Sequence, residues 1–145
     1  MKNFILLFSS LFVLKFCAAQ ELSGHRWQDR VILLFADGPG QPDLQRQLAL
    51  LTENAAEVTE RDLVRYRIYP QGDLSPAGEA QTFNRARALR SEYNAPDASF
   101  LFILIGKDGT EKLRSREVVS PDALFARIDR MPMRRAEMRR KNGDG

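Results

Sequence analysis

Two continuous apolar segments constrain the fold of this 145-residue chain more than any other feature. The first, Val31 to Ala36, contains no polar residue and is followed by the chain breakers of residues 37–40. The second, Phe100 to Ile105, is the strongest strand candidate in the chain. A short apolar run that ends at Gly and Pro is typical of a strand buried on both faces. We therefore expect a central sheet that is covered by helices.

The segments between and after these runs predict alternating helices and strands. Apolar residues at helical spacing indicate a first helix with Asp43 as its N-cap, and Ser75-Pro76 is typical of the start of a second. Asp108-Gly109 predicts a hairpin. In chain order we expect strand 31–36, helix 43–58, strand 63–69, a helix from 75 to about 94, strand 100–105, strand 110–116 and a helix capped by Ser120-Pro121. This β-α-β-α-β-β-α order is a three-layer α/β plan and is also that of the minimal thioredoxin fold.

Residues 1–19 have the pattern of a secretory signal peptide. Lys2 supplies the positive charge, an apolar stretch follows, and Cys17-Ala18-Ala19 provides small residues for cleavage before Gln20. The stretch is shorter than the roughly twenty apolar residues of a membrane-spanning helix, so we expect no transmembrane span after cleavage. The predicted location is the periplasm or the cell exterior. The alternatives are an uncleaved N-terminal anchor and a lipoprotein acylated on Cys17, although Lys15-Phe16 does not fit a lipobox.

Cys17 is the only cysteine, and it lies within the expected signal peptide. The mature chain would therefore have no disulfide framework and would need an ordinary hydrophobic core. We expect one folded domain over residues 29–132. A polar linker over 20–28, with Trp27 as the first core residue, would precede the domain, and a basic tail over 133–145 would follow it.

Three segments resemble a known family: residues 47–51, 104–109 and 128–138, the last of which contains Met-Arg-Arg-Ala-Glu-Met. They are similar to the P-DUDES family, a thioredoxin-like domain of unknown function. That family occurs in exported bacterial proteins and in animal secreted proteins of the sushi-repeat and equarin type. The resemblance extends from Arg26 to about Arg140. It implies export and a thioredoxin-like, peroxiredoxin-like fold, and it supplies no reaction.

The residues available for catalysis are few. Thioredoxin chemistry needs a low-pKa thiolate at the start of the first helix. The corresponding loop, residues 37–43, contains no sulfur, so we exclude cysteine-based redox activity for the mature chain. We expect the only histidine, His25, to be solvent-exposed, which argues against a Ser-His-Asp triad and against a zinc site. The loop residues singled out are Asp37, Gly38, Pro39, Gly40 and Asp43.

One enzymatic hypothesis remains for this loop. Asp37 and Asp43 could act as an acid and a base in a non-redox reaction. The simpler interpretation is that Asp43 caps its helix and Asp37 serves the turn. A phosphate-binding loop is disfavoured, because both carboxylates would repel the phosphate. We predict neither a metal nor a cofactor.

Positive charge is concentrated near the C-terminus. The expected mature chain has a net charge of +1, whereas residues 127–141 alone contain seven basic and two acidic residues. Three interpretations remain open: these cations bind an anionic polymer, they dock on the acidic remainder of the domain, or they form a solvated helix end. The candidate binding residues are Arg114, Arg116, Arg134, Arg135, Arg139 and Arg140.

We therefore expect a non-catalytic domain that binds a protein or an anionic component of the cell envelope or extracellular space. Aromatic residues do not interleave with the arginines, so nucleic acid is not an expected partner. A further hypothesis is an interaction module that uses Met131, Met133 and Met138, since methionine suits adaptable apolar contacts. Pro132 should interrupt the last helix, and a short basic helix could follow it.

Overall fold

The computed structural model describes residues 22–74, 83–95 and 97–143. The expected signal peptide and the Ser75-Pro76 helix start lie outside the described residues. The elements are η1 (Ser23–His25), β1 (Arg30–Ala36), α2 (Pro42–Glu53), α3 (Ala55–Glu60), β2 (Leu63–Tyr69), β3 (Gly72–Leu74), α4 (Phe83–Glu92), β4 (Phe100–Ile105), β5 (Glu111–Ser115), α5 (Pro121–Asp129) and α6 (Pro132–Gly143).

The strands form one mixed sheet in the order β3-β2-β1-β4-β5. β1 is parallel to β2 and antiparallel to β4, so that Leu33 lies between Tyr66 and Ile103. Every residue of β1 and β4 is buried, which confirms the central position predicted for the two apolar runs. The predicted β4–β5 hairpin is also confirmed. Gly109 has a φ of 80° in its turn, a conformation that favours glycine.

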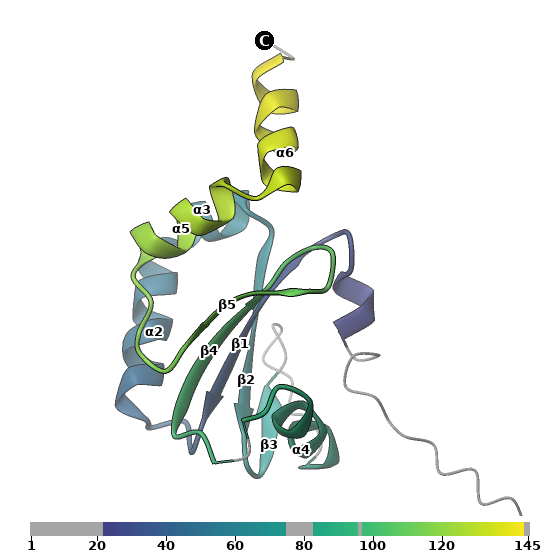
Figure 1. Ribbon diagram of the computed structural model, residues 1–145. Helices are drawn as coiled ribbons and strands as arrows, with labels where there is room; N and C mark the ends of the chain where they lie inside the picture. The colour runs from purple at the N-terminus through teal and green to yellow at the C-terminus, as the bar shows by residue number, and fades with distance from the viewer. Residues whose placement is uncertain (1–21, 75–82, 96, 144–145) are drawn as a thin grey trace, which may run out of the picture.

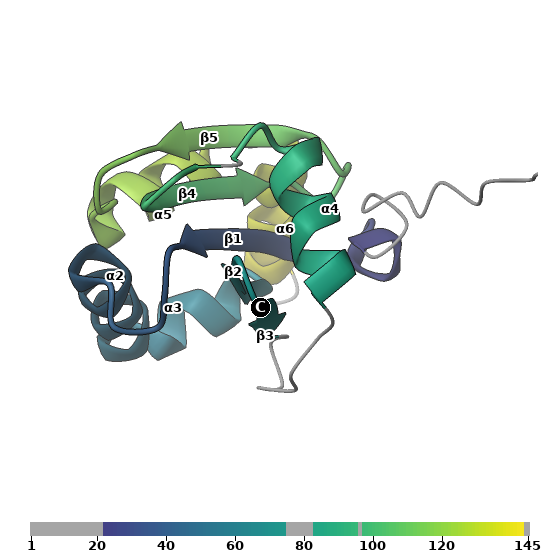
Figure 2. The same ribbon diagram turned by 90° about the horizontal axis from the view of Figure 1, so that it is seen from below.

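Helices cover both faces of the sheet (Figures 1 and 2). α2, α3 and α5 lie on one face, whereas α4 and η1 lie on the other. Successive strand residues point to opposite faces, so Ile32 packs with Leu44 and Phe125 while Leu33 packs with Leu89. The predicted three-layer α/β class is confirmed.

Two local predictions for the first helix are wrong. Gln41 is the N-cap in place of Asp43, because Gln41 Oε1 accepts a hydrogen bond from the Leu44 amide at 2.7 Å. The predicted single helix is divided into α2 and α3 at Asn54. The Asn54 side chain donates to the Leu50 carbonyl at 2.8 Å. Side-chain bonds of this kind compete with helical backbone bonds, and apolar periodicity does not reveal them.

The segment from Leu22 to Gln28 is part of the folded domain and not a linker. Leu22 is buried against the α4 side of the sheet. His25 Nδ1 lies 2.7 Å from Asp29 Oδ2 and His25 Nε2 lies 2.7 Å from the Tyr66 hydroxyl, so the expectation of simple solvent exposure is wrong. Trp27 is 59% exposed, which also contradicts its predicted place in the core.

The C-terminal part of the chain is helical up to Gly143. Ser120 caps α5 as predicted, since its hydroxyl accepts from the Ala123 amide at 3.3 Å. The interruption at Pro132 is confirmed, because α5 ends at Asp129 and α6 begins at Pro132. Residues 132–143 form a helix that extends beyond the end of the sheet (Figure 1). The region named as the basic tail is thus helical, in agreement with the short basic helix considered after Pro132. Within the described ranges, no helix has the length and apolar character needed to cross a membrane.

Candidate functional site

The candidate residues lie at two opposite ends of the sheet. β1 begins at Arg30, near α6, and ends at Ala36, which leads into the loop 37–43 (Figure 1). The loop lies at the end where thioredoxin chemistry would take place. The C-terminal cations of α6 lie at the other end, so the two sets of candidates form separate surfaces.

The loop 37–43 carries two exposed carboxylates, Asp37 and Asp43. Asp37 is exposed, and its amide donates to the Ser99 carbonyl at 3.2 Å. Asp43 is exposed in the first turn of α2. No hydrogen bond joins these two side chains in the described structure, and the same residues contain no cluster of three or more His, Cys, Asp or Glu suited to a metal ion.

A buried arginine supports this end of the sheet from below the loop. Arg90 is 5% exposed, and its guanidinium donates to the carbonyls of Ala36, Ile68 at 3.3 Å and Ala95 at 3.0 Å. Burial lowers the pKa of Arg90, and the charges of Asp37 and Asp97 act in the opposite direction. Arg90 thus connects the ends of β1 and β2 with the segment that leads to β4. Its role in the domain is structural.

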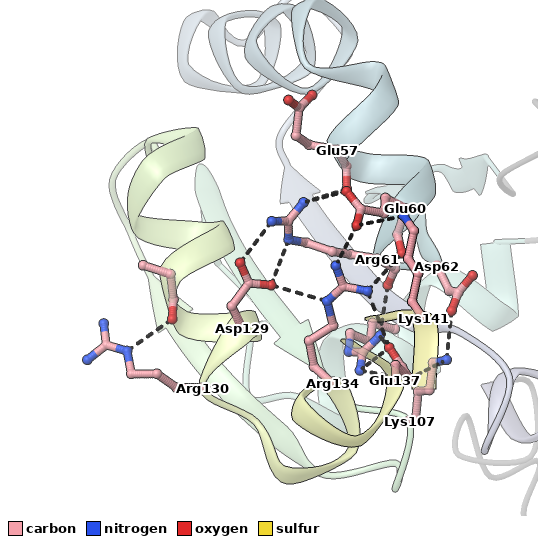
Figure 3. A network of polar contacts seen from close by, with 12 residues as sticks. Glu57, Glu60, Arg61, Asp62, Lys107, Asp129, Arg130, Arg134, Glu137 and Lys141 are labelled. Atoms are coloured by element: carbon pink, nitrogen blue, oxygen red, sulfur yellow. Dashed lines mark hydrogen bonds and ion pairs between the residues drawn. The ribbon is translucent and has the colours of Figure 1, made fainter. Parts of the chain in front are cut away.

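Charged side chains connect α6 to the other end of the sheet (Figure 3). They come from the starts of β1 and β2, the turn after β4, and the helices α3, α5 and α6. We call this group the ionic network. Its members are Arg30, Glu60, Arg61, Asp62, Lys107, Asp129, Arg134, Glu137 and Lys141.

Glu137 lies at the centre of the ionic network. Its carboxylate accepts from Arg30 at 3.1 Å and pairs with the Lys107 ammonium at 2.9 Å. Arg30 is 1% exposed and also donates to the Arg61 carbonyl at 2.9 Å. Burial raises the pKa of Glu137, but hydrogen bonds from Lys107 and Arg30 outweigh it, and the net pKa is lowered. The carboxylate is therefore held in its charged form.

Arg134 belongs to the ionic network and not to the exposed surface. It is 4% exposed and donates to Asp129 at 3.2 Å and to Glu60 at 3.0 Å. Burial raises the pKa of Asp129, and bonds from Arg61 and Arg134 reverse that effect and lower it. We had grouped Arg134 with the binding arginines. The sequence does carry a signal for its position, since Arg134, Glu137 and Lys141 recur at the spacing of one helix face.

Three arginines project from the remaining surface of α6. Arg135, Arg139 and Arg140 are exposed, and none of their side chains forms an ion pair or hydrogen bond with the described residues. Met133, next to them, is 36% exposed. Beside these groups lies an open depression of about 430 Å³, bordered by Met133, Ala136, Glu137, Arg139 and Arg140. This side of α6 is a positively charged surface without an internal counterion.

The hairpin arginines do not extend this surface. Arg114 pairs with Glu111 at 2.8 Å and donates to the Tyr93 carbonyl at 2.9 Å. Arg116 lies beyond the end of β5 and borders a depression of about 360 Å³ together with Asp43, near the start of α2. Because β5 ends at Ser115, Arg116 lies outside the strand and does not share a strand face with Arg114.

The fold and the loop without a thiol define a class: a mixed α/β domain of the thioredoxin-like fold. The chain belongs to the family described as "Domain of unknown function (DUF4174)", whose model matches residues 21–137. A reduced 2-Cys peroxiredoxin from Plasmodium vivax has a similar structure, with a TM-score of 0.56 and 15% identity over 81% of this chain and 84% of that chain. At this identity the likeness shows the fold alone. No curated protein matches the chain.

Proposed function

We propose that this protein is an exported, non-catalytic domain that binds an anionic polymer through the outer side of α6. The observation that carries the proposal is the division of charge along this helix. Arg134 is neutralised within the ionic network, whereas Arg135, Arg139 and Arg140 have no partner among the described residues. The proposal includes export, on the basis of the signal-peptide pattern, and the relationship with the P-DUDES family.

The geometry of α6 suits the binding of a multivalent anion. Arg135 and Arg139 are four residues apart, so they are neighbours on one side of the helix, where like charges repel each other. An anionic chain along this side would relieve that repulsion and release counterions. On the opposite side of α6, Glu137 and Arg134 form ion pairs with the rest of the domain. These pairs fix the position of the helix, and therefore of its exposed arginines.

A sulfated polysaccharide column, such as immobilised heparin, tests the proposal. We expect Arg135→Gln with Arg139→Gln to lower the affinity about 30-fold, because a cation near an anionic surface contributes about 1 kcal/mol. The matched control is Arg46→Gln with Arg116→Gln, which removes the same charge from the opposite end of the sheet. Elution salt and affinity at fixed salt are the measurements.

Each outcome decides the proposal. A selective loss in the α6 variant supports it. An equal loss in both double variants would show that only net charge matters, and failure of the unaltered protein to bind would refute the proposal. Deletion of α6 is unsuitable as a test, because it would also remove Glu137 from the buried Arg30.

A further inference from the structure

A tight turn beside the ionic network contains a residue that the turn itself does not favour. The His25 carbonyl accepts from the Gln28 amide at 3.0 Å, Arg26 has φ −58° and ψ 129°, and Trp27 has φ 69°. These values describe a type II turn, whose third residue is normally Gly or Asn. Asp62 and Asn94, the other non-glycine residues with positive φ in the described ranges, are of types that tolerate this conformation.

Packing does not explain the tryptophan either. Aromatic side chains usually stabilise a fold by burying large areas, yet Trp27 is the more exposed of the two large apolar side chains that lie open to solvent in the described ranges. Its ring is flanked by the Arg26 guanidinium, 5.4 Å from the ring centroid. Arg26 is exposed, and its side chain has no hydrogen bond or ion pair with any described residue. The turn thus presents an aromatic ring together with a cation that has no counterion among the described residues.

The turn is connected to α6 by one residue. The Trp27 amide donates to the Lys107 carbonyl at 2.7 Å, and the Lys107 ammonium pairs with Glu137 of α6 at 2.9 Å. A single lysine therefore spans the interval between the turn and the helix. Glu137 also borders the depression beside Arg139 and Arg140.

We propose that Arg26 and Trp27 form a platform that stacks on a sugar ring, so that the anionic polymer held by α6 is a polysaccharide. This inference rests on the proposed function of α6 and names the class of its ligand. An aromatic face packs on the apolar face of a sugar, and the arginines pair with its acidic substituents. An anionic membrane is less suited, because an interfacial helix needs an apolar face, and the apolar residues of α6 are only Met133, Ala136 and Met138.

Trp27 is the only tryptophan in the chain, so its fluorescence reports on the platform directly. We expect heparin oligosaccharides to change its emission and to protect it from quenching by acrylamide. Inorganic polyphosphate, which has charge without rings, should bind α6 with a similar salt dependence and leave Trp27 unprotected. Equal protection by both polyanions would overturn the proposal. Protection only by vesicles of anionic phospholipid would assign the platform to a membrane instead.

Two variants separate this proposal from that for α6. Trp27→Asn, which suits the turn, should raise Tm and weaken heparin binding about tenfold, with polyphosphate binding unchanged. Trp27→Phe should retain most of the heparin affinity, whereas the Arg135→Gln, Arg139→Gln double variant should lose both ligands. If the arginine variant loses heparin and Trp27→Asn does not, the platform is refuted and the function of α6 stands. A lower Tm for Trp27→Asn would show that the indole serves packing, which would also refute the platform.

Discussion

His25 fastens the N-terminal segment to the middle of the sheet. A carboxylate only accepts hydrogen bonds, so Nδ1 donates to Asp29, and Nε2 forms a hydrogen bond of 2.7 Å with the Tyr66 hydroxyl. The Tyr66 ring packs in the core between β1 and α4, whereas Asp29 immediately precedes β1. His25 therefore sets the position of the turn that carries Trp27.

Removal of the Tyr66 hydroxyl should weaken this attachment without leaving a large cavity. We expect Tyr66→Phe to lower the free energy of unfolding by about 1 kcal/mol, the usual net contribution of one hydrogen bond. Tyr69→Phe is the matched control, because the Tyr69 hydroxyl has no hydrogen bond in the described structure. Its effect should remain within about 0.5 kcal/mol. Urea unfolding measures both changes, and equal losses would contradict the role given to His25.

Single-residue burial was predicted least well, and Trp27 and Arg30 show why. The prediction that Trp27 is a core residue is wrong, and no sequence pattern indicated that Arg30, the residue before the predicted strand, would be buried. The burial of Arg30 depends on Glu137, which is 107 residues away in the sequence. Because the two residues of this ion pair are so far apart in the sequence, no local pattern reveals the pair. Without its carboxylate partner, an arginine would be expected at the surface, since burial of an unpaired charge is costly.

At the scale of the element, α6 shows how a polar helix is held in place. Its sequence provides little apolar surface, so packing alone would not fix it. Pro132 suits the first turn, and Arg134 and Glu137 then reach charged partners on α3, α5 and the sheet. The helix is stabilised through one side only, which leaves the opposite side free for a ligand.

Loss of Glu137 should therefore destabilise the whole domain. Glu137→Ala removes the carboxylate from Arg30, which cannot reach water, and we expect a loss of about 3 kcal/mol in the free energy of unfolding. Glu53→Ala is the control, because Glu53 is exposed on α2 and has no ion pair with any residue described. Guanidinium unfolding measures the difference. A loss below about 1 kcal/mol would show that the ionic network behaves as an ordinary surface salt bridge.

The strands were predicted more accurately than the charged sites, for a physical reason. The limits of β4 and the Asp108-Gly109 hairpin follow from apolar runs and turn residues, which are local information. Arg135, Arg139 and Arg140 were grouped with Arg134 as candidate binding residues, and docking of these cations on the domain was left open. Their separation from Arg134 depends on which side of α6 meets Glu60 and Asp129, and that side is set by tertiary packing.

At the scale of the whole molecule, the two ends of the sheet have different electrostatic roles. Near the loop 37–43, Arg90 binds backbone carbonyls, and the charges of Asp37 and Asp97 favour its protonated form. Near α6, carboxylates from distant parts of the chain form ion pairs with the buried cations Arg30 and Arg134. The other arginines of α6 have no such carboxylate and remain exposed to solvent. The stability of the fold and the proposed binding surface therefore depend on the same helix.

This dependence makes the domain sensitive to acid. The pKa values of Asp129 and Glu137 lie below their ordinary values of 3.8 and 4.5, because bonds from arginine and lysine outweigh the effect of burial. A carboxylate with a lowered folded pKa stabilises the protein above its unfolded pKa, and that stabilisation is lost as the pH falls through the folded value. We expect the free energy of unfolding to be nearly constant above about pH 5 and to fall below about pH 4.5.

Urea titrations of the unaltered protein and of Glu137→Gln from pH 7 to pH 3 measure this dependence. The difference in the free energy of unfolding between the two proteins should shrink as the pH decreases. A difference that stays constant over this range would mean that Glu137 contributes through its shape, and not through its charge.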